Sequence, residues 1–271
     1  MAITVAEALR TAGVDAMESR ALLRAVLGVG DDSQLAAHPE RELSGAERDR
    51  YREWLQRRRE GEPVAYLTGE REFYSLALHV TPAVLIPRPE TELLVDAALD
   101  RIPAQAPRRA LDLATGSGCV AIAIATQRPR ALVTASDASG EALAVARRNA
   151  ARHAARVEFV QGDWFAALAG RRFELIVSNP PYVADDDPHL ARGDLRYEPR
   201  QALVAGPTGL ECIELVVAQA AQHLAADGWL LLEHGHDQGA RARALLAAAG
   251  YRDVFTCRDL AGIERVSGGR I

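Results

Sequence analysis

Strand and helix patterns alternate along the chain from Arg109 onward, and this alternation limits the possible folds more than any other feature of the sequence. Short apolar runs typical of buried strands are separated by longer stretches with helical spacing. Chains with this order bury their strands in a parallel sheet and pack helices on both of its faces. The sequence therefore predicts an α/β fold with a mostly parallel sheet.

The first predicted strand ends near Asp112 and leads into a short glycine-containing loop before the next helix. Glycines let a ligand approach the backbone closely, and the start of a helix offers N–H groups without internal partners. The spacing matches neither the dinucleotide-binding pattern nor a P-loop, since no Lys follows the glycines. We expect this loop to bind a ligand, although a structural turn explains the same pattern; its residues are Ala114, Thr115, Gly116, Ser117 and Gly118.

Acidic residues end the next two predicted strands. Asp137 lies about 20 residues beyond the glycine loop, where nucleoside-binding units carry the carboxylate that accepts the ribose hydroxyls. The same acid could instead stabilise the start of the following helix through the helix dipole. Asp163 and Trp164 suit an adenine, with the acid near its amine and the aromatic ring on its face. The other interpretation of Trp164 is a tryptophan buried in the core.

A fourth strand, at residues 173–178, is followed by Asn179, Pro180, Pro181 and Tyr182. The two prolines stiffen this loop and keep the residue before each of them out of the helical region. Asn179 is therefore held at the carboxyl end of a strand, the edge at which open α/β sheets bind ligands. Its amide can form hydrogen bonds with an NH2 group, and the Tyr182 ring can stack on such a group if it is planar. A simple turn is the alternative.

The order of these four strand ends along one sheet edge resembles the class I methyltransferases that use S-adenosylmethionine. Within that class, Asn-Pro-Pro-Tyr marks enzymes that methylate planar nitrogens, such as DNA adenine N6 and protein glutamine N5 methyltransferases. Four further segments extend the resemblance over nearly the whole chain and narrow it to the PrmC/HemK family: Glu62–Gly69, Leu85–Glu92, Arg200–Leu210 and Glu264–Val266.

The resemblance implies a class I, Rossmann-like methyltransferase domain with a mostly parallel seven-stranded sheet, preceded by a small helical domain. We place the helical domain with its connecting hairpin at residues 1–80 and the methyltransferase domain at residues 81–271. The family transfers a methyl group from S-adenosylmethionine to the side-chain amide nitrogen (N5) of the glutamine in the Gly-Gly-Gln motif of class 1 peptide chain release factors. The helical domain is then expected to recognise the release factor.

The resemblance also implies roles for particular residues. The Asn179 side-chain oxygen and the Pro180 carbonyl would accept the two hydrogens of the target amide, while Pro181 and Tyr182 shape the slot around it. No metal is implied. The cofactor-binding residues would be Ala114, Thr115, Gly116, Ser117, Gly118, Asp137, Asp163, Trp164 and Asn179.

Ala114 departs from the family pattern, which has glycine as the first residue of this loop. Alanine is acceptable at a position with a negative φ, and we expect Ala114 to occupy such a position. Cofactor binding is then expected to survive the replacement of the glycine.

Two other acceptors fit parts of the pattern. Ribosomal-protein glutamine methyltransferases tend to carry Ser where Pro89 follows Arg88 in this chain, so Pro89 favours a release factor. A DNA adenine methyltransferase is expected to carry a basic region that extrudes the base, and the sequence offers none. The 32 basic and 37 acidic residues give a net charge of −5, which also argues against affinity based on phosphate neutralisation.

Several shorter patterns give weaker expectations. Residues 1–60 have helical spacing, and residues 63–82 resemble a hairpin that includes Tyr66. Residues 185–187 and 192–198 form a polar stretch that resembles a surface loop. The run Arg57–Arg59 could bind a partner or simply end a solvated helix. His234 and His236 could form part of a metal site, but the sequence offers no third ligand beside them. A strand end packed near the edge of the sheet explains the two histidines better.

Cysteine usage and hydropathy indicate where such a chain works. Its three cysteines, Cys119, Cys212 and Cys257, are far apart and lack metal-binding spacing, so we expect reduced thiols in a cytoplasmic protein. No signal peptide or membrane span is visible. We expect a monomer that binds neither membranes nor, directly, nucleic acid.

Overall fold

The structure, a computed structural model, describes residues 3–271 and divides into two compact units. The first unit runs up to Glu70 and includes Ala191–Tyr197, whereas the second consists of Arg71–Leu190 and Glu198–Ile271. This division differs from the expected boundary near residue 80. The hairpin belongs to the second unit because its side chains, Phe73 and Leu78 among them, are buried in the core of that unit.

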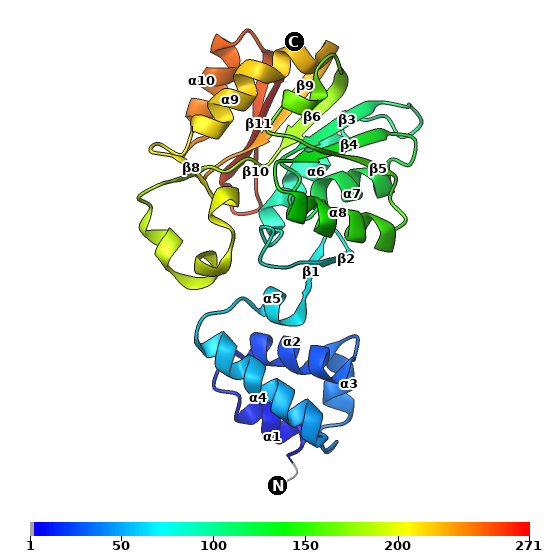
Figure 1. Cartoon of the computed structure of the whole chain (residues 1–271), viewed down its shortest axis with the longest axis vertical. Helices are drawn as coiled ribbons and strands as arrows, with labels where there is room; N and C mark the ends of the chain where they lie inside the picture. Colours follow the sequence, from blue (N-terminus) through cyan, green and yellow to red (C-terminus); the bar gives the residue numbers. More distant parts are fainter. Residues whose placement is uncertain (1–2) are drawn as a thin grey trace. The chain divides into compact units, whose positions relative to one another are not determined.

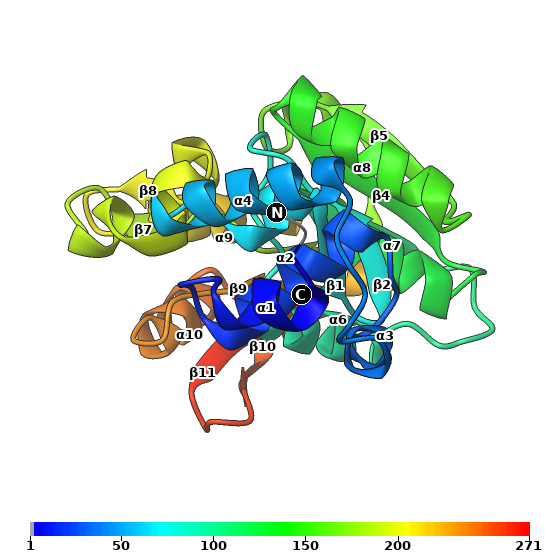
Figure 2. The same cartoon turned by 90° about the horizontal axis from the view of Figure 1, so that it is seen from below.

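The first unit is built from short capped helices, drawn in blue to cyan in Figures 1 and 2. Ser44 and Glu47 form a capping box at the start of one of them. Leu22, Leu23, Tyr51 and Leu55 are buried together in a hydrophobic core that belongs to this unit. The helices are α1 (Val5–Arg10), α2 (Ala16–Leu27), α3 (Asp32–Ala37), α4 (Gly45–Arg59) and α5 (Val64–Thr68).

The arginine run at the end of α4 is engaged within this unit. Arg58 forms ion pairs with Glu18 of α2 at 2.7 Å and with Asp194 at 2.9 Å. Its neighbours also have partners, since Arg57 pairs with Glu62 and Arg59 donates to the Ala12 carbonyl. The run therefore joins α4 to α2 and to the segment 191–197.

A two-stranded sheet opens the second unit and consists of β1 (Glu70–Phe73) and β2 (Leu76–His79). Tyr74 and Ser75 connect these strands with φ values of 51° and 61°, as a two-residue hairpin turn requires. The hairpin expected from the sequence is present, but Tyr66 is wrongly placed in it, because Tyr66 belongs to α5.

The main sheet has seven strands in the order β10-β11-β9-β6-β3-β4-β5. The neighbours from β9 to β5 pair in parallel, and β11 pairs antiparallel with both β9 and β10. The mostly parallel sheet is therefore confirmed. The strands are β3 (Arg109–Leu113), β4 (Leu132–Asp137), β5 (Val157–Gln161), β6 (Phe173–Ser178), β9 (Leu224–Glu233), β10 (Arg252–Arg258) and β11 (Glu264–Arg270).

Helices cover both faces of this sheet, with α6, α7 and α8 on one face and α9 and α10 on the other (Figure 1). Alternate residues of β3 contribute to the two cores, since Ala110 faces one of them and Leu111 the other. The helices are α6 (Glu92–Leu99), α7 (Cys119–Gln127), α8 (Gly140–Arg152), α9 (Glu211–Ala220) and α10 (Gly239–Ala248).

The stretch after Tyr182 is more ordered than the expected surface loop. Glu198 is buried, pairs with Arg88 and accepts a hydrogen bond from the Ile86 N–H at 3.1 Å. These contacts hold Glu198 against the segment before α6. Its elements are β7 (Val183–Ala184), η3 (Pro188–Ala191), η4 (Gly193–Tyr197), η5 (Arg200–Ala202) and β8 (Val204–Gly206), and the remaining 3-10 helices are η1 (Pro89–Thr91), η2 (Ala166–Leu168) and η6 (Ala221–His223).

None of the helices among residues 3–271 combines the length and the hydropathy that crossing a bilayer requires.

Candidate active site

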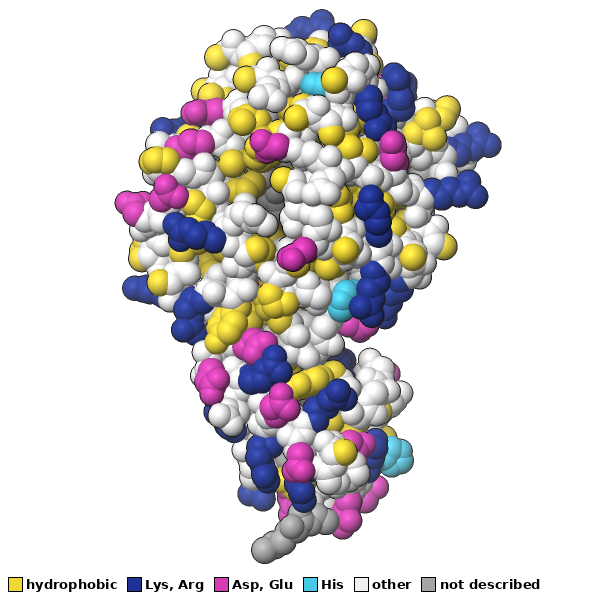
Figure 3. Space-filling view, in the orientation of Figure 1, with side chains coloured by type: hydrophobic (Ala, Val, Ile, Leu, Met, Phe, Trp, Pro, Cys, Tyr) yellow, Lys and Arg dark blue, Asp and Glu magenta, His cyan; other side chains and the backbone are white. Residues whose placement is uncertain are grey.

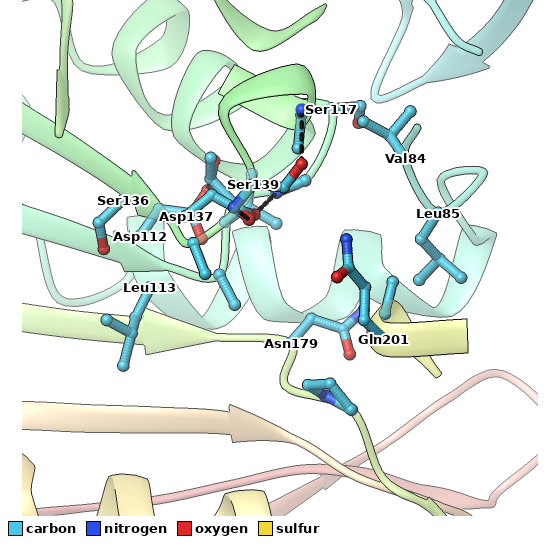
Figure 4. Close-up of a pocket in the computed structure, with 18 of the residues that line it drawn as sticks. Val84, Leu85, Asp112, Leu113, Ser117, Ser136, Asp137, Ser139, Asn179 and Gln201 are labelled. Carbon is cyan, nitrogen blue, oxygen red and sulfur yellow. Dashed lines mark hydrogen bonds between the residues drawn. The ribbon is translucent and has the colours of Figure 1, made fainter. Parts of the chain in front are cut away.

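A pocket of about 270 Å³ lies at the carboxyl ends of β3, β4, β5 and β6 (Figure 4). The parallel strands bring together residues that are far apart in the sequence, as the alternation of strands and helices predicts. Gly118, Pro180 and Tyr182 are not among the lining residues. The site residues named from the sequence that do line the pocket are Ala114, Thr115, Gly116, Ser117, Asp137, Asp163, Trp164, Asn179 and Pro181.

Asp112 holds the glycine loop and the start of α7 in place through hydrogen bonds. Its carboxylate accepts hydrogen bonds from the Thr115 hydroxyl at 2.5 Å and from the Ala121 N–H at 3.0 Å. Burial raises the pKa of Asp112 to about 6. Gly118 serves packing, because a Cβ there would lie 3.1 Å from the Cβ of Ala146.

Ala114 has a φ of 62°, in the left-handed region, and this corrects the expectation of a negative φ. The chain must turn sharply here to pass from β3 into the loop, and glycine is the residue that makes such a turn without steric cost. An L-residue in this conformation costs about 1–2 kcal/mol because its Cβ approaches the following carbonyl oxygen. The alanine is therefore accommodated with backbone strain at the wall of the pocket.

Asp137 joins the glycine loop to the start of α8, as the dashed lines in Figure 4 show. Its Oδ2 accepts from the Gly116 N–H at 2.9 Å, and its Oδ1 accepts from the Ser139 N–H at 2.9 Å. Each carboxylate oxygen has a further lone pair that can accept another hydrogen bond. The structural role that we considered for this acid is thus present, and its role toward a ribose stays a prediction.

Asp163 and Trp164 form another wall of the pocket, directly after β5. The Trp164 backbone has a φ of 45°, and its half-buried ring also packs against one of the two cores of this unit. Both interpretations of this tryptophan therefore fit its position. The contact of these two residues with an adenine remains a prediction.

Asn179 places an unpaired acceptor in the pocket. Its Nδ2 donates to the Thr91 hydroxyl at 3.2 Å, whereas its buried Oδ1 has no hydrogen-bond partner among residues 3–271. Figure 4 shows this side chain extending between Asp137 and Leu85. A buried acceptor without a partner costs about 1–3 kcal/mol, so a donor supplied by a ligand would be favourable here.

The loop that carries Asn179 is held in place by hydrogen bonds of Tyr182. The Tyr182 hydroxyl donates to Glu233 Oε1 at 3.3 Å, and the Tyr182 carbonyl accepts from Gln238 Nε2 at 3.0 Å. Glu233 is only 1% exposed, and burial raises its pKa to about 7. A side chain at Gly209 would lie 2.7 Å from the Tyr182 carbonyl oxygen, so this position requires glycine.

Several pocket residues were missed as site residues from the sequence. They lie before α6 or after the Asn-Pro-Pro-Tyr loop, in segments that have no polar strand end to mark them. Except for Cys212, they lie in segments that carry the family resemblance, and this resemblance was the available signal. These residues are Leu85, Arg88, Thr91, Gln201 and Cys212.

His234 lies directly after β9, as the strand-end interpretation predicts. Both of its ring nitrogens have partners, Nδ1 with the Gly235 carbonyl and Nε2 with the Ser267 hydroxyl, each at 2.9 Å. The described part of the chain contains no group of three His, Cys, Asp or Glu side chains arranged to hold a metal ion.

Family models match both parts of the chain. Residues 3–69 match the PrmC N-terminal domain, and residues 90–194 match the methyltransferase small domain. A methyltransferase from Pyrococcus furiosus of known structure shares the fold, with a TM-score of 0.56 and 17% identity over 80% of this chain and 98% of that chain.

Curated relatives match nearly the whole chain. The release factor glutamine methyltransferase of Burkholderia pseudomallei is 51% identical over 99% of this chain and 96% of its own length. The protein of that name from Escherichia coli K12 is 52% identical over 80% of this chain and 78% of its own length. Identity of this extent confirms the resemblance seen in the sequence, and the chain belongs to the release factor glutamine methyltransferase family.

Proposed function

We propose that this chain transfers a methyl group from S-adenosylmethionine to the side-chain amide nitrogen, N5, of the glutamine in the Gly-Gly-Gln motif of class 1 peptide chain release factors. The family supports the reaction, and the observation in the structure that carries it is the unpaired Asn179 Oδ1. An acceptor in this place suits a substrate that presents N–H groups, as a primary amide does.

An amide nitrogen is a poor nucleophile because its lone pair is delocalised into the carbonyl. Holding both of its N–H groups aims the nitrogen at the methyl donor, and such positioning can supply much of the rate. Asn179 Oδ1 would accept one N–H, and the Pro180 carbonyl would accept the other, as the family resemblance implies. No general base is needed before transfer, because the proton is lost readily once the nitrogen carries the methyl group.

S-Adenosylmethionine supplies an activated methyl group when it is bound. The pocket offers donors and acceptors of the kind that this molecule needs. Asp137 would accept from the ribose hydroxyls, Asp163 would accept from the adenine amine, and Trp164 would pack on the ring. The loop from Ala114 to Ser117 would approach the cofactor through its backbone.

The first unit is proposed to recognise the body of the release factor. It contains none of the residues that line the pocket. Figure 3 shows basic and acidic side chains interspersed over its visible face, which suits a protein surface with charges of both signs. We further propose that the protein acts as a monomer in the cytoplasm and binds no nucleic acid directly.

Labelled S-adenosylmethionine tests the acceptor. The label should enter an intact release factor and a Gly-Gly-Gln peptide, but not a peptide in which glutamate replaces the glutamine. A ribosomal protein serves as the competing acceptor, and exclusive labelling of it would refute the release-factor proposal.

Replacing Asn179 tests the grip on the amide. Asn179→Ala should lower turnover by roughly two orders of magnitude, as expected for one positioned group at a reacting centre. Calorimetry should show that the variant still folds and binds the cofactor. Turnover close to that of the wild type would refute the role of Asn179.

A further inference from the structure

The orientation of the Asn179 amide decides whether the pocket presents an acceptor or a donor. The oxygen and the NH2 group of an asparagine have nearly the same shape, so packing alone does not distinguish the two orientations. With Oδ1 toward the substrate, the pocket accepts an N–H; with the amide flipped, it would present an N–H to the N–H groups of the substrate. Hydrogen-bond partners must therefore select the orientation.

Thr91 supplies the partner on the other side of the amide. It is 2% exposed, and its hydroxyl oxygen accepts from Asn179 Nδ2 at 3.2 Å. A hydroxyl has one hydrogen and can either donate or accept toward a given neighbour. It holds the NH2 group of Asn179 firmly only if its own hydrogen points elsewhere.

Glu233 gives that hydrogen a destination. It is the last residue of β9, the strand beside β6, and its Oε1 accepts from the Tyr182 hydroxyl at 3.3 Å. Its buried Oε2 has no hydrogen-bond partner among residues 3–271, and the Thr91 side chain is close enough to lower the pKa of this carboxyl group. An unpaired, buried carboxyl oxygen is a strong acceptor, so we expect the Thr91 hydrogen to turn toward Oε2 and to leave a lone pair for Asn179 Nδ2. Charges on Glu90 and Arg265 act on Glu233 with opposite sign.

We infer that Thr91 and Glu233 are positioning residues that fix the Asn179 amide with its oxygen toward the substrate nitrogen. The same carboxylate holds Tyr182, so one buried residue orients both ends of the Asn-Pro-Pro-Tyr loop. The consequence for catalysis rests on the proposed function, whereas the orientation itself does not. The two can therefore be tested separately.

The composition of the chain allows a direct test of the orientation. Asn149 and Asn179 are the two asparagines of the sequence. A protein labelled with ¹⁵N in asparagine alone therefore gives two side-chain amide signals. Asn149 is an internal control, because its buried Nδ2 donates to the carbonyls of His79 and Ser117 and has no contact with Thr91.

Thr91→Val removes the hydroxyl with little change of shape. The Asn179 signal should shift and its amide hydrogens should exchange faster with solvent, while the Asn149 signal stays in place; Thr91→Ser should restore the wild-type signal. Glu233→Met should have the same effect as Thr91→Val. Thr126→Val is the matched control, because the Thr126 hydroxyl bonds only within its own helix. An unchanged Asn179 signal in Thr91→Val would overturn the inference.

Kinetics on a Gly-Gly-Gln peptide provide the second measurement. Thr91→Val should lower kcat roughly tenfold, the loss expected for one hydrogen bond in the transition state, and should leave cofactor affinity unchanged. Added to Asn179→Ala, the same substitution should cause no further loss, because it acts through Asn179. Additive losses would mean that Thr91 acts independently of Asn179. An inactive wild-type protein would refute the proposed function, and the amide signals would still decide the orientation.

Discussion

Replacing Ala114 by glycine should stabilise the protein, which is the reverse of the usual effect of glycine. The φ of 62° costs an alanine about 1–2 kcal/mol that glycine does not incur. Glycine in turn gives the unfolded chain more freedom, which costs about 0.4–1 kcal/mol. The difference favours Ala114→Gly by about 0.5–1 kcal/mol, or a rise in Tm of about 2 °C for a domain of this size.

Two further alanines make the comparison specific. Ala154 has a φ of 50° just beyond α8, outside the residues that line the pocket, and Ala154→Gly should also stabilise. Ala138 lines the pocket but has no positive φ, so Ala138→Gly should destabilise by about 0.4–1 kcal/mol. Urea unfolding and thermal scans of the three variants measure these changes, and calorimetry should show cofactor affinity little altered in Ala114→Gly.

A loss of stability in Ala114→Gly equal to that in Ala138→Gly would refute the reasoning, because it would mean that the conformation of the loop imposes no strain on alanine. If Ala154→Gly alone gained stability, the account of backbone strain would be wrong only for the glycine loop. A gain in both would show that this chain tolerates backbone strain at alanines with a positive φ.

Three other changes test separate parts of the structure. Asp137→Ala should weaken S-adenosylmethionine binding by roughly 10- to 100-fold in calorimetry, since it would remove the charge-assisted hydrogen bonds proposed between this acid and the ribose. The pKa of Glu233 is raised by burial from 4.5 to about 7, so the folded protein retains a proton that the unfolded chain releases and loses stability as pH rises through this range. The stability of Glu233→Gln relative to the wild type should therefore increase as pH rises from 4.5 to about 7, by up to about 3 kcal/mol in urea titrations. Arg58→Met should destabilise the first unit by about 1–3 kcal/mol in thermal unfolding, because Glu18 and Asp194 lose their partner.

Controls follow from neighbouring groups. The hydrogen bond from Arg171 lowers the pKa of Glu158 below 4.5, so Glu158→Gln should lose stability relative to the wild type as pH rises toward 4.5, opposite in sign to Glu233→Gln and in a lower pH range. Arg52, exposed on the same helix as Arg58, should tolerate methionine. Equal effects at Arg52 and Arg58 would contradict the role of the ion pairs, and unchanged cofactor affinity in Asp137→Ala would leave that acid only its structural role.

The sequence by itself determined the α/β class, the mostly parallel sheet and the edge at which the site lies. Periodicity and turn chemistry are local properties, so they can be read from a few neighbouring residues. The positions of Asp137, Asp163 and Asn179 at strand ends follow from the same reasoning, because parallel strands end at one edge. The Asn-Pro-Pro-Tyr loop and its flanking segments are distinctive enough for the amino-acid sequence alone to identify the family.

The tertiary structure alone decided what surrounds these residues. Thr91 lies 88 positions before Asn179, and no local pattern indicates that the two side chains meet. The φ of Ala114 is imposed by the path from β3 to α7, although alanine itself prefers a negative φ. Glu198 and the arginine run resemble solvated surface in the sequence, yet their charges are paired within the fold. Long-range contacts of this kind depend on packing, which brings distant residues together only when the whole chain has folded.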